Sequence, residues 1–319
     1  MKILISPAGG RAVASIVDYF SKRCYLTIGI DSSKNATGAA LFDKFFVVPK
    51  VGEPDYEEYV GSIIVKEDVD FYISWLDPEI LFWNERFFSQ GLKWRTIFLM
   101  NFRIDLRALQ DKHLLYNKLK TLELELPKTS KLTNYMHYQD SVYYPIVIKP
   151  RLSHGGKGLI IVENYQDISC VVERLKRKKI ELDNFIIQEY IQGDEYSVDF
   201  FAIKGKVLNM VVRRRIAHDG VSTIGEVVES SILENLVSII ASKLALEGLY
   251  NIQFILRNDT FYPTDLNCRP SGTIILSIMS GVDLLQNFIE WKTGKQITIF
   301  GKPRHLKMYR VYKEIFVYD

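Results

Sequence analysis

Apolar runs separated by short polar turns dominate the first third of the chain. Residues 2–5 form one such run, which stops at the turn 6–10, and apolar residues then recur at helical spacing over residues 13–20. A second run, residues 25–30, ends at Asp31. A strand, a glycine-containing turn, a helix, a strand and an acidic residue form the usual opening of a doubly wound parallel sheet.

Three further apolar segments continue this pattern and predict strands over residues 45–48, 70–75 and 96–100. We therefore expect a small α/β domain over residues 1–105. The first turn, Gly9-Gly10-Arg11, lacks the full G-x-G-x-x-G spacing, so a tight strand-to-helix turn is favoured over a ligand-contacting loop. If the loop does meet a ligand, the free amides at the helix start favour an anion.

The pattern changes after residue 105. Leucines share one helical face over residues 114–122, and Pro127 ends that segment. Strands then outnumber helices, as in an α+β domain. The predicted strands are residues 144–148, 185–190, 196–203, 207–212, 250–256 and 261–265, and the predicted helices are 168–175 and 233–246. We expect a second domain over residues 106–300, with a small lobe at about 113–190, and a C-terminal tail over 301–319.

Composition narrows the class of protein. Apolar residues make up 47% of the 319 residues and charged residues 25%, with a net charge of +3, which is ordinary for a globular chain and lacks the basic excess of a nucleic-acid binder. The three cysteines form no C-x-x-C pair, so neither a disulfide framework nor a zinc site is predicted. The longest uncharged segment, residues 270–282, is too short to span a bilayer. A cytoplasmic location is expected, without nucleic-acid or membrane partners.

A lysine and a glycine-rich loop follow one predicted strand. Lys149 ends the strand, and the loop Ser153–Gly158 comes directly after it. Glycine lets a backbone approach a polyphosphate closely, and exposed amides together with lysines can neutralise phosphate charge. The alternative is a surface turn with a solvated lysine.

Two more clusters lie at strand ends. Residues 188–195 form a polar hinge between two strands, which could offer backbone groups to an adenine edge and the Glu195 carboxylate to ribose hydroxyls. Asp265 and Asn267 are two apart, so in extended chain they share a face, and oxygen ligands of this kind suit Mg²⁺. Arg269 continues that face and could hold an anion. The alternatives are a plain hairpin and polar strand ends.

Together and in this order, the three clusters resemble the ATP-grasp superfamily, in its carbamoyl-phosphate synthase large-chain and biotin-carboxylase form. The resemblance covers residues 105–295 or so. It implies an α/β protein with a Rossmann-like pre-ATP-grasp domain, followed by a two-lobed ATP-grasp domain. It also implies an ATP-dependent ligase of the carboxylate–amine kind, which forms an acyl phosphate and ADP.

The resemblance implies a role for each matching residue. Lys112, in the pair Asp111-Lys112, and Lys149 would contact the nucleotide phosphates, and Glu195 would bind ribose. The phosphate-covering loop would supply Ser153, Gly155, Gly156, Lys157 and Gly158, and the adenine hinge would supply Gln188, Glu189, Tyr190 and Ile191. The metal would fall on Gln253, Asp265 and Asn267. Catalytic arginines would be Arg269 together with Arg213 or Arg215, which alternation places on one strand face.

The implied ligands are ATP, Mg²⁺ with Mn²⁺ as an alternative, a small carboxylate and an amine acceptor. The sequence does not decide between a monomer and a homodimer. Two departures keep a non-catalytic nucleotide- or metabolite-binding homologue in view: Gln253 stands where an acid is common, and Asp265 is one methylene shorter than the usual Glu. A Rossmann dehydrogenase with NAD at Gly9 and Gly10 is a further alternative, although its glycine fingerprint is missing. His218 is expected to be a loop surface residue.

Overall fold

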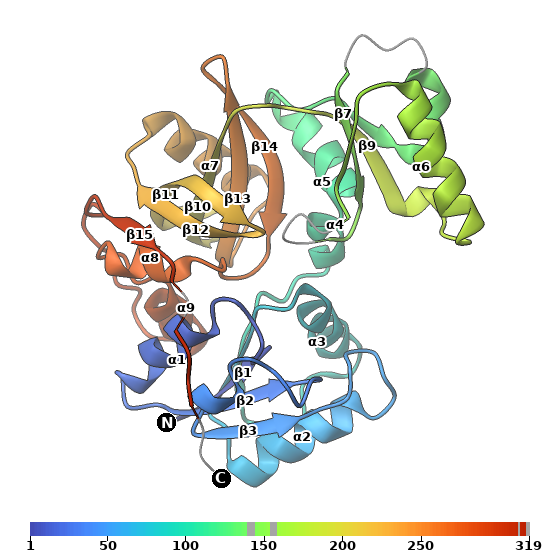
Figure 1. The fold of residues 1–319 in the computed structure, drawn as a ribbon. Coiled ribbons are helices and arrows are strands. Elements are labelled where there is room, and N and C mark those ends of the chain that lie inside the picture. Colours follow the sequence, from blue (N-terminus) through green and yellow to red (C-terminus); the bar gives the residue numbers. More distant parts are fainter. Residues whose placement is uncertain (139–143, 154–157, 312, 317–319) are drawn as a thin grey trace.

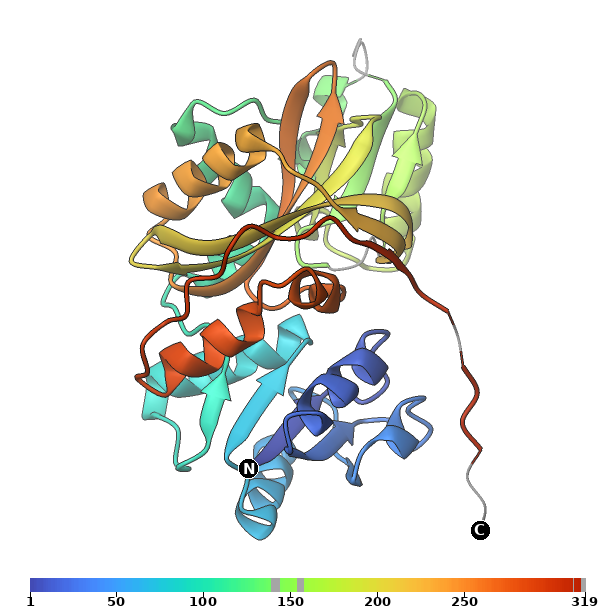
Figure 2. The ribbon, with the colours of Figure 1, turned by 90° about the vertical axis from the view of Figure 1, so that its left-hand side faces the viewer.

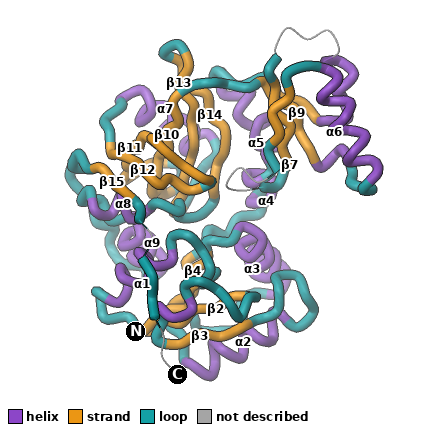
Figure 3. The backbone as a smooth tube through the Cα atoms, viewed as in Figure 1, coloured by secondary structure: helices purple, strands orange, loops and turns teal. Residues whose placement is uncertain are grey.

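The computed structural model describes residues 1–138, 144–153, 158–311 and 313–316. Three sheets organise the chain, and they are visible as separate groups of strands in Figure 3. The N-terminal domain lies below the other two groups in Figure 1. This arrangement of a parallel N-terminal sheet and two antiparallel sheets confirms the predicted fold class.

The N-terminal sheet is parallel and has the strand order β3-β2-β1-β4-β5. Its strands are β1 (Lys2–Ser6), β2 (Leu26–Asp31), β3 (Lys44–Val47), β4 (Phe71–Ser74) and β5 (Ile97–Leu99), and its helices are α1 (Val13–Ser21), α2 (Tyr56–Glu67) and α3 (Asp77–Gln90). Alternation along β1 sends Leu4 into one core with α2 and α3, and Ile3 and Ile5 into another with α1. Helices thus cover both faces, as the doubly wound pattern predicts.

The small lobe is an antiparallel sheet with the order β6-β9-β7-β8. Its elements are β6 (Thr129–Lys131), β7 (Ile146–Pro150), β8 (Ile160–Val162), α6 (Tyr165–Arg177) and β9 (Phe185–Glu189). The apolar face of α6 packs on this sheet in a core of its own. The predicted strand 144–148 is displaced by two residues, so Lys149 lies inside β7. Two helices, α4 (Leu106–Gln110) and α5 (Lys112–Leu119), connect this lobe to the N-terminal domain.

The large sheet is antiparallel, with the order β14-β13-β10-β11-β12-β15. Its strands are β10 (Asp194–Ile203), β11 (Lys206–Asp219), β12 (Val221–Val227), β13 (Gly248–Arg257), β14 (Thr260–Asn267) and β15 (Lys307–Tyr309), and its helices are α7 (Ser231–Lys243), α8 (Ile274–Met279) and α9 (Leu284–Lys292). Short 3₁₀ helices complete the fold at Ala39–Leu41, Lys120–Leu122, Leu132–Tyr138 and Leu182–Asn184. β12, β15, α8 and α9 were not expected from the sequence.

Helices α8 and α9 lie between the large sheet and the N-terminal domain (Figure 2). The same apolar core contains Phe288 of α9, Phe201 of the large sheet and Ile5 of β1. Asp283, which precedes α9, accepts hydrogen bonds from Tyr19 Oη at 3.0 Å and pairs with Arg23 at 2.8 Å. The two domains therefore share one continuous core. Within the described residues, no helix has the length and apolar character needed to cross a membrane.

One lysine of this interface has an unusual environment. The Lys292 Nζ lies 4.5 Å from the centroid of the Trp291 ring and 5.1 Å from that of Phe102. Burial lowers the pKa of Lys292 to about 8, and the nearby Glu247 carboxylate acts in the opposite direction. The charged form is therefore disfavoured in the folded protein, although the rings stabilise it in part.

Lys292→Met is expected to raise the free energy of unfolding at pH 7 by about 1–2 kcal/mol, because it removes a desolvated charge. The folded pKa of about 8 lies below the usual 10.5, so the folded protein binds fewer protons between these pH values and the wild type gains stability as pH rises through them. The advantage of Met should therefore shrink. Urea unfolding at pH 7 and at pH 9.5 measures the stability difference between Lys292→Met and the wild type at each pH. Lys295→Met, at an exposed lysine, is the control. If Lys292→Met were stabilised by the same amount at both pH values, the desolvated charge of Lys292 would not be the cause.

Candidate functional site

A cavity of about 290 Å³ opens between the small lobe and the large sheet. Its walls come from β7 and β9 on one side and from β10, β13 and β14 on the other. The structure thus brings most of the predicted site residues to one place. Those lining this cavity are Lys149, Ser153, Gln188, Glu189, Tyr190, Ile191, Glu195, Arg215, Gln253, Asp265 and Asn267.

Two lysines lie near the Asp265 carboxylate of β14 at this cavity. Lys149 is only 7% exposed, and burial lowers its pKa; the Asp265 carboxylate opposes this shift and the Lys112 charge adds to it. The Lys112 Nζ lies 3.2 Å from Asp265 Oδ1 and donates a hydrogen bond to the Ser153 carbonyl oxygen at 2.7 Å. Two cations thus share one carboxylate, an arrangement suited to a polyanionic ligand.

The Asp-Lys pair has a local reason for its position. Asp111 is the N-cap of α5, and its carboxylate accepts hydrogen bonds from the backbone N–H groups of His113 and Leu114. Arg151, just after β7, pairs with the same carboxylate at 2.8 Å. This cap fixes the first turn of α5, and so it fixes where Lys112 emerges. Of the glycine-rich loop, Gly155, Gly156 and Lys157 lie outside the described residues, and Gly158 has a φ of +77°.

The hinge joins the small lobe to the large sheet between β9 and β10 (Figure 1). Gln188 Nε2 donates to Thr129 Oγ1 at 2.6 Å, and the Glu189 carboxylate pairs with Arg257 at 2.9 Å. The Tyr190 N–H donates to the Pro145 carbonyl oxygen at 3.3 Å. The hinge is therefore held from both lobes.

Glu195, expected to meet ribose, already has two basic neighbours. Arg215 Nη1 lies 2.8 Å from its carboxylate, and His218 Nε2 lies 3.0 Å from it. His218 was expected to be a loop surface residue; it is exposed, as expected, but it lies at the end of β11 and not in a loop, where it lines the cavity. A bound ribose would therefore compete with, or extend, an existing network.

Arg213 and Arg215 lie at different depths on β11. Arg213 is 2% exposed and pairs at 2.8 Å with Asp199, which is fully buried. Its guanidinium also donates to Ser271 Oγ at 3.0 Å. Arg215, by contrast, lines the cavity. Arg213 is buried below the cavity and does not line it. Of the two arginines, only Arg215 is therefore placed to contact a ligand.

The proposed metal ligands meet across two paired strands. Gln253 lies directly opposite Asp265 in the β13–β14 register, and Asn267 is two residues further along β14. One carboxylate and two amide oxygens form a hard donor set, which fits a Mg²⁺ ion that brings nucleotide phosphates as its other ligands. Among the residues that the structure describes, no three His, Cys, Asp or Glu side chains gather into a metal cluster.

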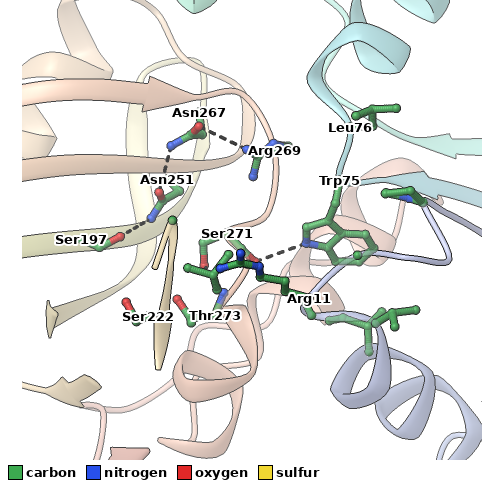
Figure 4. A pocket seen from close by; sticks show the side chains of 18 of the residues that line it. Arg11, Trp75, Leu76, Ser197, Ser222, Asn251, Asn267, Arg269, Ser271 and Thr273 are labelled. Atoms are coloured by element: carbon green, nitrogen blue, oxygen red, sulfur yellow. Dashed lines mark hydrogen bonds between the residues drawn. The ribbon is translucent and has the colours of Figure 1, made fainter. Parts of the chain in front are cut away.

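A second cavity, of about 490 Å³, separates the large sheet from the N-terminal domain (Figure 4). Trp75 and Leu76 line it from the β4–α3 turn, and Gly9 and Gly10 from the β1–α1 turn. The wall that it shares with the first cavity consists of Arg215, Gly220, Gln253 and Asn267. The two cavities are therefore neighbours that meet at the proposed metal position.

The glycine turn at this cavity is internally bonded. The Gly9 N–H donates to Asp31 Oδ2 at 2.8 Å, and the Gly10 N–H donates to the Pro7 carbonyl oxygen at 3.1 Å. This is the tight-turn interpretation favoured from the sequence, although the turn also lines a cavity. The amides of Gly9 and Gly10 are thus already engaged.

Arg269 reaches the same region but has a partner from the other domain. Its Nε lies 2.8 Å from Asp77 Oδ1, and its Nη2 donates to Asp77 Oδ2 at 3.1 Å and to Asn267 Oδ1 at 3.4 Å. Asp77 is the first residue of α3, so the N-terminal domain sets the direction of this guanidinium. The sequence shows a helix start at Asp77-Pro78, but nothing in it links that position to one 192 residues away.

Comparisons with known proteins found two family models and several relatives. A family model described as "ATP-grasp in the biosynthetic pathway with Ter operon" matches residues 181–313, and one described as "PylC-like, N-terminal domain" matches residues 3–91. The arginine-specific carbamoyl phosphate synthase large chain of Halalkalibacterium halodurans is 25% identical over 265 residues, which is 78% of this chain and 25% of that protein. An ATP-grasp family model thus matches the C-terminal part of this chain, and a PylC-like N-terminal model matches its first domain. This chain spans about a quarter of the length of that curated relative.

Solved structures share this fold over nearly the whole chain. The biotin carboxylase domain dimer of the Hydrogenobacter thermophilus 2-oxoglutarate carboxylase, a complex with MgADP, ADP and bicarbonate, has a TM-score of 0.73 at 14% identity and covers 93% of this chain and 70% of that one. The N5-carboxyaminoimidazole synthetase of Staphylococcus aureus, complexed with ADP, has a TM-score of 0.73 at 14% identity, with coverages of 97% and 82%. At this identity the likeness establishes the fold.

Asp77→Ala is expected to lower the free energy of unfolding by about 1–3 kcal/mol, because it leaves a largely buried guanidinium without its bidentate partner. Asp55→Ala is the matched control: Asp55 is exposed and precedes α2 as Asp77 opens α3. It should change stability by no more than about 0.5 kcal/mol. Urea unfolding of both variants measures the difference, and equal losses would argue against a cross-domain role for Asp77.

Proposed function

We propose that this ATP-grasp protein is an ATP-dependent ligase of the carboxylate–amine kind. The observation that carries the proposal is the shared wall of two cavities. One cavity has the hinge and Lys149 in its wall, with Lys112 held against Asp265 of that wall, and the other opens toward the N-terminal domain. Their common wall contains Gln253, Asn267 and Arg215. Phosphoryl transfer depends mainly on positioning and charge neutralisation, so adjoining sites for ATP and an acid are the arrangement it needs.

In this proposal ATP occupies the smaller cavity. Lys112 and Lys149 neutralise its phosphates, together with the loop from Ser153 to Gly158. The hinge residues Gln188–Ile191 receive the adenine, and Glu195 receives the ribose. The depressed pKa of Lys149 supports its part, since a desolvated ammonium without bound anion is unfavourable and gains most from a phosphate partner.

Gln253, Asp265 and Asn267 would hold Mg²⁺, with Mn²⁺ as an alternative, next to the terminal phosphates. When bound, the ion would neutralise charge that develops on the transferred phosphoryl group. Asp265 now contacts Lys112 at 3.2 Å, so this lysine and the ion would share the carboxylate. Arg215 and Arg269 would orient the anionic groups on the other side.

The reaction then proceeds in two balanced steps. A carboxylate oxygen of the acid attacks the γ-phosphorus, the bond from that phosphorus to the bridging oxygen breaks, and ADP leaves. An amine nitrogen next attacks the acyl carbon of the resulting acyl phosphate, inorganic phosphate leaves and the nitrogen loses a proton. Neither step requires a Ser or Cys nucleophile.

A non-catalytic nucleotide-binding protein is the second candidate. The observation that favours it is the single carboxylate, Asp265, at the metal position, with an amide at Gln253. An ADP-release screen over small acids, with and without amines, separates the two candidates. Acid-dependent ADP release supports the ligase, whereas nucleotide binding without release on any acid supports the second candidate.

Lys149→Ala is expected to lower ATP turnover by about 100-fold, because a desolvated cation at the phosphates is lost. The fold should persist, since the side chain is replaced by a smaller one at a cavity wall. Steady-state ADP release measures the effect, and Lys176→Ala on the exposed side of α6 in the same lobe is the control. If Lys149→Ala released ADP at the wild-type rate, Lys149 would not neutralise the nucleotide phosphates.

Asp265→Asn is expected to raise the Mg²⁺ concentration needed for half-maximal ADP release by about tenfold, because the only charged oxygen donor of the proposed set becomes neutral. A Mg²⁺ titration at saturating ATP checks this. Asp259→Asn, in the β13–β14 turn, is the matched control. An unchanged titration curve would contradict the metal position.

A further inference from the structure

The second cavity has two chemically different sides (Figure 4). The N-terminal domain contributes an apolar wall that includes Val13, Ile16 and Trp75. The Trp75 Nε1 donates a hydrogen bond to the Ser271 carbonyl oxygen at 3.2 Å, which fixes the plane of the indole ring. A rigid aromatic ring beside aliphatic side chains favours an apolar ligand group.

The backbone acceptors on the opposite side are already engaged. The carbonyl oxygens of residues 271–273 each accept a hydrogen bond from a side chain of this protein. Trp75 donates to the first at 3.2 Å, Arg310 to the second at 2.9 Å and Arg213 to the third at 3.3 Å. A ligand N–H donor would therefore share each of these carbonyl oxygens with a side chain of this protein.

The charged residues around this cavity also favour a ligand carboxylate over a ligand ammonium group. Among the described residues that line this cavity there are arginines but no Asp or Glu. Two acids next to its wall are paired with arginines, Asp77 with Arg269 at 2.8 Å and Glu195 with Arg215 at 2.8 Å. An ammonium group in the cavity would lose its hydration without gaining a carboxylate, which is costly, whereas a carboxylate would meet arginine at the shared wall.

On this basis, and resting on the proposed ligase function, we propose that the acid substrate is an aromatic or bulky aliphatic carboxylic acid without an ammonium group. Its carboxylate lies at the shared wall formed by Arg215, Gln253 and Asn267. Its apolar body lies against Trp75 and the first turn of α1. The cavity volume of about 490 Å³ is within the usual range for small-molecule sites.

Two ligands that differ by one ammonium group test this directly. 3-Phenylpropanoate and L-phenylalanine are titrated calorimetrically into the full chain, with saturating MgADP and without nucleotide. 3-Phenylpropanoate is expected to bind at least tenfold more tightly. Trp75→Ala should weaken it by tenfold or more, and Trp75→Phe, which keeps an aromatic ring, should weaken it by less than threefold. Urea unfolding and MgADP binding confirm that each variant is folded.

A gain-of-function variant gives a second, independent readout. Leu76 lines the cavity, is partly exposed and is the N-cap of α3, a position that suits Asp and Asn equally. Leu76→Asp adds a carboxylate to the wall, and Leu76→Asn adds a group of the same shape without charge. Leu76→Asp should reduce the preference for 3-phenylpropanoate over phenylalanine by at least fivefold, and Leu76→Asn should leave it within twofold.

The outcomes separate this inference from the proposed function. Phenylalanine binding as tightly as 3-phenylpropanoate, binding of neither compound, or an unchanged affinity in Trp75→Ala would overturn the inference. ADP release driven by other acids would in those cases leave the ligase proposal intact. The expected preference without any ADP release would support this ligand class and count against the ligase.

Discussion

A buried ion pair between two strands of the large sheet supports the proposed metal and substrate positions. Asp199 is fully buried, and its carboxylate lies 2.8 Å from Arg213 Nη2. It also accepts hydrogen bonds from Asn251 at 2.8 Å and from Ser277 at 2.7 Å. A buried carboxylate is tolerated only when charge and hydrogen bonds compensate it. These compensating partners come from β11, β13 and α8. The buried Asp199 carboxylate therefore holds these three elements in place relative to one another.

From this pair a chain of hydrogen bonds leads to the surface of the cavity. Asn267 donates to Asn251 Oδ1 at 3.2 Å, and Arg269 donates to Asn267 Oδ1 at 3.4 Å. Asp77 of the N-terminal domain then holds the far side of the Arg269 guanidinium. The side chains at the proposed metal and substrate positions are therefore oriented from below by the large sheet and from the side by the other domain. Such support from neighbouring groups is what precise placement requires.

Local patterns in the sequence were sufficient for part of this picture. The β1–turn–α1 opening, Lys149 near a strand end and the shared face of Asp265 and Asn267 depend on neighbours within a few residues, and those expectations agree with the positions observed. β12 escaped prediction because its sequence, VSTIGEV, alternates weakly and contains glycine. β15 is three residues long and is a strand only because β12 lies beside it. The depth of Arg213 and the pairing of Asp77 depend on tertiary contacts that no spacing encodes.

The continuous core between the domains has a consequence for the order of folding. Ile3 and Ile5 share a core with Leu249, Leu285 and Phe288. The core around the first strand is therefore complete only when residues nearly three hundred positions later have been synthesised. During synthesis the N-terminal sheet leaves the ribosome with that part of its surface uncovered, and contacts of such long sequence separation form slowly. The apolar face of the N-terminal sheet therefore stays exposed until residues 249–288 have been made.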